Sequence, residues 1–107
     1  MKQISATELA AWLADQRREK PLLLDVREPW EWEAARIAGA QHIPMRDVPA
    51  RVQELDSARD LVAICHHGGR SQQVAMFLEK NGFSKVHNLQ GGVDAWSRTV
   101  DPAVPLY

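Results

Sequence analysis

Disulfide bonds within this chain are excluded, because its 107 residues include a single cysteine, Cys65. Positive charge is not in excess either: Lys and Arg number 13, Asp and Glu number 14, and the net charge is −1. This balance argues against a general electrostatic grip on nucleic acid. No apolar run approaches the roughly 18 residues that span a bilayer, and Glu8, Trp12 and Asp15 interrupt what would be the apolar part of a secretory signal. We therefore expect a cytoplasmic protein with no nucleic acid and no membrane partner.

Internal repeats, low-complexity segments and flexible linkers are lacking as well. The chain is 45% hydrophobic and 25% charged, which is an ordinary globular composition. Its length fits one domain, which we place at residues 1–107.

Short apolar runs alternate with helical patterns along the chain. Ser5 and Glu8 form a capping-box pattern, which predicts a helix that begins after Ser5. The runs Leu22–Val26 and Leu61–Ile64 lack polar alternation, which is typical of strands buried on both faces. Such alternation of strands and helices predicts an α/β fold with a mostly parallel sheet covered on both faces. The other expected elements are strands at Gln41–Ile43 and Val86–Leu89, a helix at Gln72–Lys80 that ends at Asn81-Gly82, and a last helix marked by Val93 and Trp96.

Two segments follow the expected strands where sheets of this kind bind ligands, beyond the carboxyl ends: Asp25–Glu28 and Cys65–Ser71. In the second, Gly68 and Gly69 can adopt backbone angles that turn N–H groups into an anion-binding nest. The start of the following helix adds its positive end, and the segment contains no acidic residue. These surroundings favour the thiolate of Cys65, which is the nucleophilic form. The alternative is that Cys65 is only a small buried apolar residue.

Five motifs follow one another along the chain. They are Asp25-Val26-Arg27-Glu28-Pro29, Glu31-Trp32, Ile37-Ala38-Gly39-Ala40 before Ile43-Pro44, the loop Cys65–Ser71, and Leu89-Gln90-Gly91-Gly92 with Trp96. Each motif alone is weak, but their order and spacing together resemble the single-domain rhodanese-like sulfurtransferases. The resemblance implies a three-layer α/β/α fold around a five-stranded parallel sheet.

The same resemblance implies an enzyme of the thiosulfate sulfurtransferase type. The Cys65 thiolate would take the outer sulfur of a donor such as thiosulfate or a persulfide. It would then pass this sulfur to cyanide, a thiol or a protein acceptor. Because the chain has no second cysteine, the sulfur has to leave to an external acceptor. No cofactor and no metal are expected, and Arg70 would fix the loop and the donor anion. The remaining residues of the expected active-site loop are His66, His67, Gly68, Gly69 and Ser71.

Some residues near these motifs carry two interpretations. Asp25 either caps a strand end or anchors amides of the catalytic loop. Arg27 is either a solvated charge or a group that steers anions, and the resemblance favours a position in the pocket. Ala35-Arg36 stands where the family commonly has Gly-His, which either alters a nearby hydrogen bond or adds a cation at the pocket mouth. The two loop histidines either line the pocket or point to solvent. Among the tryptophans, we expect Trp12, Trp32 and Trp96 in the core and Trp30 on a partly exposed partner or substrate surface.

Three rival functions remain open. Phosphatases and arsenate reductases that share this fold place five residues between Cys and Arg, whereas four separate Cys65 from Arg70 here. A sulfur-carrier or interaction module would serve a partner protein and need no turnover of its own. Metal binding by Cys65, His66 and His67 is disfavoured, because adjacent residues on a tight loop rarely point at one ion.

Overall fold

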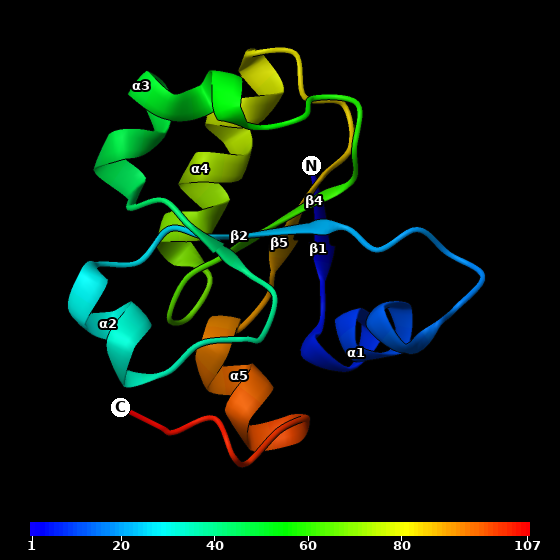
Figure 1. Cartoon of the computed structure of the whole chain (residues 1–107), viewed down its shortest axis with the longest axis vertical. Coiled ribbons are helices and arrows are strands. Elements are labelled where there is room, and N and C mark those ends of the chain that lie inside the picture. The colour runs from blue at the N-terminus through cyan, green and yellow to red at the C-terminus, as the bar shows by residue number, and fades with distance from the viewer.

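A five-stranded, all-parallel sheet forms the centre of the computed structural model, which describes residues 1–107. The strands run in the order β1-β5-β4-β2-β3, and helices cover both faces of the sheet (Figure 1). The expected α/β/α arrangement is therefore confirmed. The strands are β1 (Lys2–Ile4), β2 (Leu22–Asp25), β3 (Gln41–His42), β4 (Leu61–Ile64) and β5 (Val86–Leu89). The helices are α1 (Ala6–Ala14), α2 (Pro29–Ala34), α3 (Val48–Arg51), α4 (Gly69–Lys80) and α5 (Gly92–Thr99), with 3-10 turns at Met45–Asp47 and Val52–Glu54.

Neighbouring residues of each central strand serve opposite faces of the sheet. Leu23 and Val62 join the apolar cluster under α1 and α5, whereas Leu24 and Ala63 join the cluster under α3 and α4. Each cluster contains 13 buried residues, so both faces of the central strands are covered. This explains why the strand sequences are apolar without alternation.

The helix ends follow the capping signals of the sequence. Ser5 caps α1 in the expected capping box, with Glu8 N–H donating to Ser5 Oγ and Ser5 N–H donating to Glu8 Oε1. Gly82 follows α4 with φ +92°, as the Asn81-Gly82 pattern predicts. At its other end α4 begins at Gly69, earlier than the expected Gln72, because Gly68 already accepts the first helical hydrogen bond.

The carboxyl ends of β2 and β3 differ by one residue from those predicted. β2 ends at Asp25 rather than Val26, and β3 ends at His42 rather than Ile43. The chain turns after β2, because the Asp25 carboxylate accepts the backbone N–H of Arg27. The strand β1 has no apolar run and two of its three residues are exposed, so the sequence pattern does not predict it.

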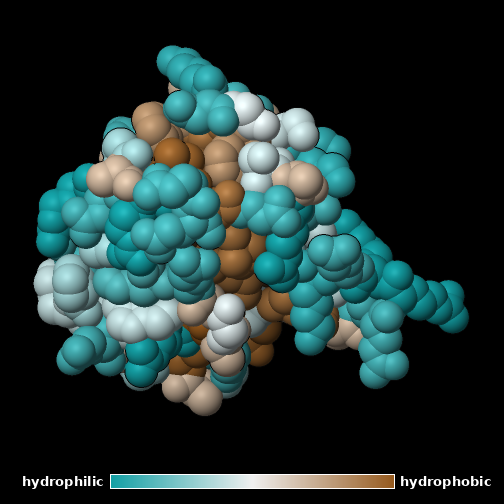
Figure 2. All heavy atoms as spheres, turned by 45° about the horizontal axis from the view of Figure 1, so that its top comes forward, coloured by the Kyte–Doolittle hydropathy of each residue, from teal (hydrophilic) through white to brown (hydrophobic).

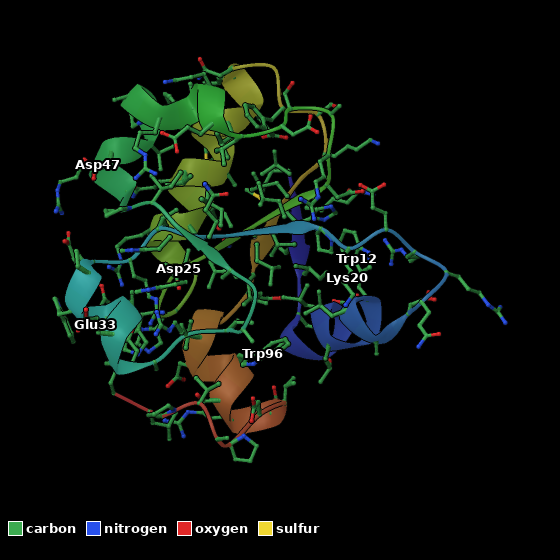
Figure 3. The ribbon with its side chains drawn as sticks, in the orientation of Figure 1. Trp12, Lys20, Asp25, Glu33, Asp47 and Trp96 are labelled. Carbon is green, nitrogen blue, oxygen red and sulfur yellow. The ribbon has the colours of Figure 1, made fainter.

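Three of the four tryptophans lie where they are expected. Trp12 and Trp96 are buried on the α1–α5 side of the sheet (Figure 3), and Trp30 is 65% exposed. The prediction that Trp32 lies in the core is wrong. It is only half-buried and stacks on the His42 ring with centroids 4.9 Å apart, because α2 lies at the end of the sheet and buries only Glu31.

None of the helices has both the length and the apolarity required to cross a bilayer. In the view of Figure 2 the surface is mostly hydrophilic, and hydrophobic atoms gather in a central band.

Candidate active site

The sulfur of Cys65 lies just after the carboxyl end of β4, beside the turn that leads into α4. Gly68 N–H donates a hydrogen bond to Cys65 Sγ at 3.0 Å, and Ser71 Oγ, in the first turn of α4, lies 3.2 Å from the same sulfur. Cys65 itself is only 1% exposed. The Gly68 N–H therefore points at the sulfur, where it stabilises negative charge.

The turn depends on the backbone of Gly68. This residue has φ +107° and caps α4, whereas Gly69 has an ordinary helical conformation. A Cβ at Gly68 would approach Gly91 N and Leu89 O to 3.3 Å each. The expectation that at least one glycine of this loop is strained for other residues is thus confirmed at Gly68.

Asn88 on β5 holds both Gly68 and Ser71, the two residues whose polar groups lie against the sulfur. Its Nδ2 donates to Gly68 O at 3.1 Å, and its Oδ1 accepts from Ser71 Oγ at 2.5 Å. A second hydrogen of Nδ2 is donated to Gln3 Oε1 at 3.0 Å, which fixes the orientation of the amide. Sequence reasoning misses Asn88, because no motif marks a polar residue on a buried strand as part of the site.

The Gly91-Gly92 motif lets α5 approach the other side of the loop. Gly91 has φ +79° and Gly92 has φ +59°. Val93 N–H and Asp94 N–H donate to Cys65 O and His66 O at 2.9 and 3.1 Å. A Cβ at Gly92 would overlap those two carbonyl groups, so only glycine fits there.

Arg70 forms an ion pair with Glu31 on α2. Its two terminal nitrogens donate to the two Glu31 carboxylate oxygens at 2.6 and 2.9 Å. The Arg70 hydrogen bonds lower the pKa of Glu31 to about 2, and the pair raises the pKa of Arg70. Arg70 is predicted to fix the loop and the donor anion. Its ion pair with Glu31 ties the first turn of α4 to α2.

Asp25 and Arg27 form a second, fully buried ion pair beneath the site. Arg27 Nε and NH2 donate to the Asp25 carboxylate at 2.7–3.1 Å, and NH2 also donates to Ala35 O. The interpretation of Arg27 as a solvated charge is wrong, because its side chain is fully buried. Asp25 does not anchor amides of the 65–71 loop, because Arg27 occupies its carboxylate. Arg36, the departure from the family pattern, lies over the Trp32 ring at 4.8 Å.

Tyr107 joins the two ion pairs and covers the loop. Its hydroxyl donates to Glu31 Oε2 at 2.9 Å and accepts from Arg27 NH1 at 2.7 Å. Burial raises the pKa of Tyr107 to about 12. Its ring stacks on His66 with centroids 4.0 Å apart and meets Trp30 edge-on at 5.7 Å. Sequence reasoning misses Tyr107, because it lies in an irregular proline-containing tail far from every motif.

The two loop histidines occupy different environments. His66 is half-buried between Tyr107 and His67, and burial lowers its pKa. His67 is exposed, as the solvent-facing alternative predicts. One ligand atom from each histidine and one from Asp94 lie within 4.8 Å of one another. The centroids of the two histidine rings lie 3.9 Å apart, and the ring planes are inclined by 31°.

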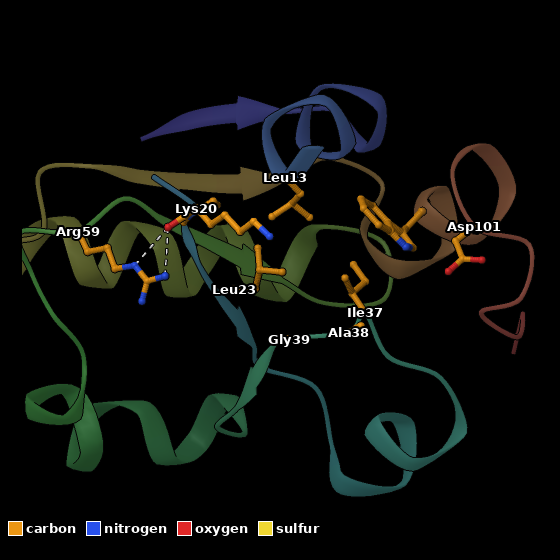
Figure 4. Close-up of a pocket in the computed structure, with 10 residues that line it drawn as sticks. Leu13, Lys20, Leu23, Ile37, Ala38, Gly39, Arg59 and Asp101 are labelled. Carbon is orange, nitrogen blue, oxygen red and sulfur yellow. Dashed lines mark hydrogen bonds between the residues drawn. The ribbon is translucent and has the colours of Figure 1, made fainter. Parts of the chain in front are cut away.

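Two hollows of the structure lie near the elements that carry the candidate site. A polar hollow of about 450 Å³ adjoins the loop at His67, Gly68 and Gly69. Another of about 410 Å³ lies between α1, α5 and β2, with Leu13, Leu23, Ile37 and Trp96 among its walls and Lys20 reaching across it (Figure 4). Cys65 lines neither of them and is almost fully buried.

Comparison with known proteins gives one consistent result. Residues 5–99 match the family model of the rhodanese-like domain. The chain is 38% identical over 104 residues to a sulfurtransferase of Allochromatium vinosum, covering 97% of this chain and 95% of that protein. It is also 38% identical to rhodanese-like/PpiC domain-containing protein 12 of Arabidopsis thaliana, but spans only 38% of that protein's length.

Solved structures agree with these relatives. A crystal structure from Staphylococcus saprophyticus has a TM-score of 0.85 and 32% identity, covering 99% of this chain and 100% of that one. A rhodanese-like domain protein from Staphylococcus aureus has the same TM-score and 29% identity, covering 100% of this chain and 99% of that one. The sulfurtransferase relatives support a role in sulfur transfer in general. This chain therefore belongs to the rhodanese-like domain family.

Proposed function

We propose that this protein is a sulfurtransferase that carries sulfane sulfur as a persulfide on Cys65. The observation that supports the proposal most directly is the hydrogen bond of 3.0 Å from Gly68 N–H to Cys65 Sγ, with the Ser71 hydroxyl 3.2 Å from the same sulfur. Such a donor lowers the free energy of a sulfur anion relative to the thiol, and the thiolate is the attacking form. The buried Asp25–Arg27 pair and Arg70 hold the surrounding elements in place.

The reaction has two displacement steps on sulfur. The Cys65 thiolate attacks the outer sulfur of the donor, the bond between that sulfur and the donor breaks, and the donor leaves with the electron pair. With thiosulfate the leaving group is sulfite. A thiolate or cyanide acceptor then attacks the outer sulfur of the persulfide and restores the Cys65 thiolate. Because Cys65 is the single cysteine, the acceptor is external.

The test is intact-mass spectrometry of the protein after incubation with thiosulfate and, separately, with glutathione persulfide. We expect a gain of one sulfur atom with at least one donor, its removal by cyanide, and no gain in Cys65→Ser. Substitution of sulfur by oxygen is nearly isosteric, so Cys65→Ser keeps the fold. The proposal fails if neither donor adds sulfur or if Cys65→Ser gains it equally. Turnover of p-nitrophenyl phosphate by the same preparation would favour the phosphatase alternative instead.

A further inference from the structure

The hollow of about 410 Å³ between α1, α5 and β2 lies outside the site proposed for sulfur transfer, because none of residues 65–71 lines it. Its apolar wall includes Leu13, Leu23, Ile37 and Trp96, of which all but Leu13 are buried. The volume falls within the roughly 300–1,000 Å³ of small-molecule sites. Such sites combine an apolar lining with a few placed polar groups, so the polar groups of this hollow indicate what it can bind.

Two cations without a carboxylate partner line one end of the hollow, Lys20 and Arg59. None of the ion pairs of the structure includes either residue. Arg59 Nε and NH2 donate to Lys20 O at 3.3 and 3.1 Å, which holds the two residues together. The Lys20 side chain extends from that point across the hollow towards Leu13 (Figure 4). Positive charge is therefore available to a bound anion at this end.

Asp101 lies at the opposite end of the hollow. In Figure 4, Leu23 and Ile37 lie between the two cations and Asp101. The Asp101 carboxylate accepts Ala103 N–H at 3.0 Å and forms no ion pair. A second carboxylate on a ligand would meet this charge without a cation to offset the repulsion. The arrangement therefore suits a ligand that carries one acid group at one end of an apolar body.

We propose that this hollow binds a small organic monocarboxylate with an apolar body, at a site separate from Cys65. The carboxylate pairs with Lys20 and Arg59, and the apolar body covers Ile37 and Trp96. Burial of the apolar body supplies affinity, and the cations supply orientation and selectivity for an acid. The proposal does not depend on the sulfurtransferase function, because no group of the cysteine loop takes part in it.

The first test titrates phenylbutyrate into the unmodified protein and follows the backbone and indole N–H signals by nitrogen-edited NMR. We expect saturable binding that moves the Trp96 indole signal and the Ile37 amide signal, while the indole signals of Trp30 and Trp32, which lie outside the hollow, stay in place. Phenylbutyramide has the same shape and no charge. It should bind about tenfold more weakly, a difference of about 1.4 kcal/mol.

Three results would overturn the proposal. They are equal affinity for the acid and the amide, shifts confined to residues outside the hollow, and no saturable binding of phenylbutyrate up to about 10 mM. Cys65→Ser should bind phenylbutyrate as the unmodified protein does, so the result is independent of sulfur loading.

The second test removes the charge of Lys20. Lys20→Met keeps an unbranched side chain, and the position is exposed, so the fold is retained. We expect the dissociation constant for phenylbutyrate to rise about threefold, with that for phenylbutyramide changed little, because an exposed ion pair contributes up to about 1 kcal/mol. Lys85→Met is the matched control, because it removes the same charge from an exposed lysine outside the hollow. Equal weakening in both variants, or none in Lys20→Met, would contradict the assigned position of the carboxylate.

Discussion

Ser71 donates a hydrogen bond of 2.5 Å to Asn88, so the hydroxyl that lies 3.2 Å from Cys65 Sγ is held by a side chain from β5. Asn88 lies on β5 opposite Ala63 of β4, two residues before Cys65. The same amide donates to Gly68 O. One side chain therefore positions both the residue whose N–H donates to Cys65 Sγ, Gly68, and the Ser71 hydroxyl beside that sulfur.

Replacement of Asn88 by leucine should displace the Gly68 N–H and the Ser71 hydroxyl from Cys65 Sγ. We expect Asn88→Leu to lower the rate of persulfide formation about tenfold and to shift the rise of that rate to higher pH, because hydrogen bonds to a charged group contribute roughly 1.5–3 kcal/mol. The measurement is single-turnover sulfur loading from pH 6 to 10. Asn81→Leu at the exposed end of α4 is the control. A merely structural role for Asn88 would reduce stability and leave the pH profile where it is.

Gly68 and Gly82 offer a matched pair of positive-φ glycines. Their φ values are +107° and +92°, but a Cβ meets backbone at 3.3 Å only at Gly68. We expect Gly68→Ala to reduce sulfur loading more than tenfold, because the strained turn withdraws its N–H from Cys65 Sγ. Gly82→Ala should introduce only backbone strain, which lowers the free energy of unfolding by about 1–2 kcal/mol. Equal activity in both variants, measured with glutathione persulfide, would show that the Gly68 turn is dispensable.

The fold was predictable because its signals are local and repeated. Leu61–Ile64 is apolar without alternation, and the structure covers both of its faces. The cysteine loop was predictable for a similar reason, since strand, glycines and helix are contiguous in sequence.

What could not be predicted are pairings between distant elements. Asn88 reaches Ser71 across the sheet, and Tyr107 reaches Glu31 and Arg27 from the far end of the chain. Nothing in the residue types indicates these partners. The burial of Trp32 was predicted wrongly for the same reason, because it depends on where α2 lies relative to the sheet.

Acid should weaken the link between α2 and the loop. Because the pKa of Glu31 is lowered from its ordinary value to about 2, the ion pair stabilises the folded state fully above about pH 4.5. This stability is lost as the pH falls from about 4.5 towards 2. Chemical denaturation at pH 7, 4 and 3 should show a smaller acid-induced loss in Glu31→Gln than in the parent. Glu54→Gln, with an exposed partner, should follow the parent closely. Parallel loss in all three proteins would show that the Glu31–Arg70 pair contributes little.

Tyr107 can be followed alone, because it is the only tyrosine of the chain. Its pKa is raised to about 12, chiefly by burial, so the folded protein keeps a phenol proton that the unfolded chain loses near pH 10. The unfolding free energy should therefore fall as the pH rises from about 10 to 12, and Tyr107→Phe should lack this component. At pH 8 Tyr107→Phe should lose about 1–3 kcal/mol, because Arg27 NH1 is left without its buried partner. Phenolate absorbance measures the titration directly. If it appears near pH 10 while the protein is still folded, Tyr107 is not held over the loop as the structure describes.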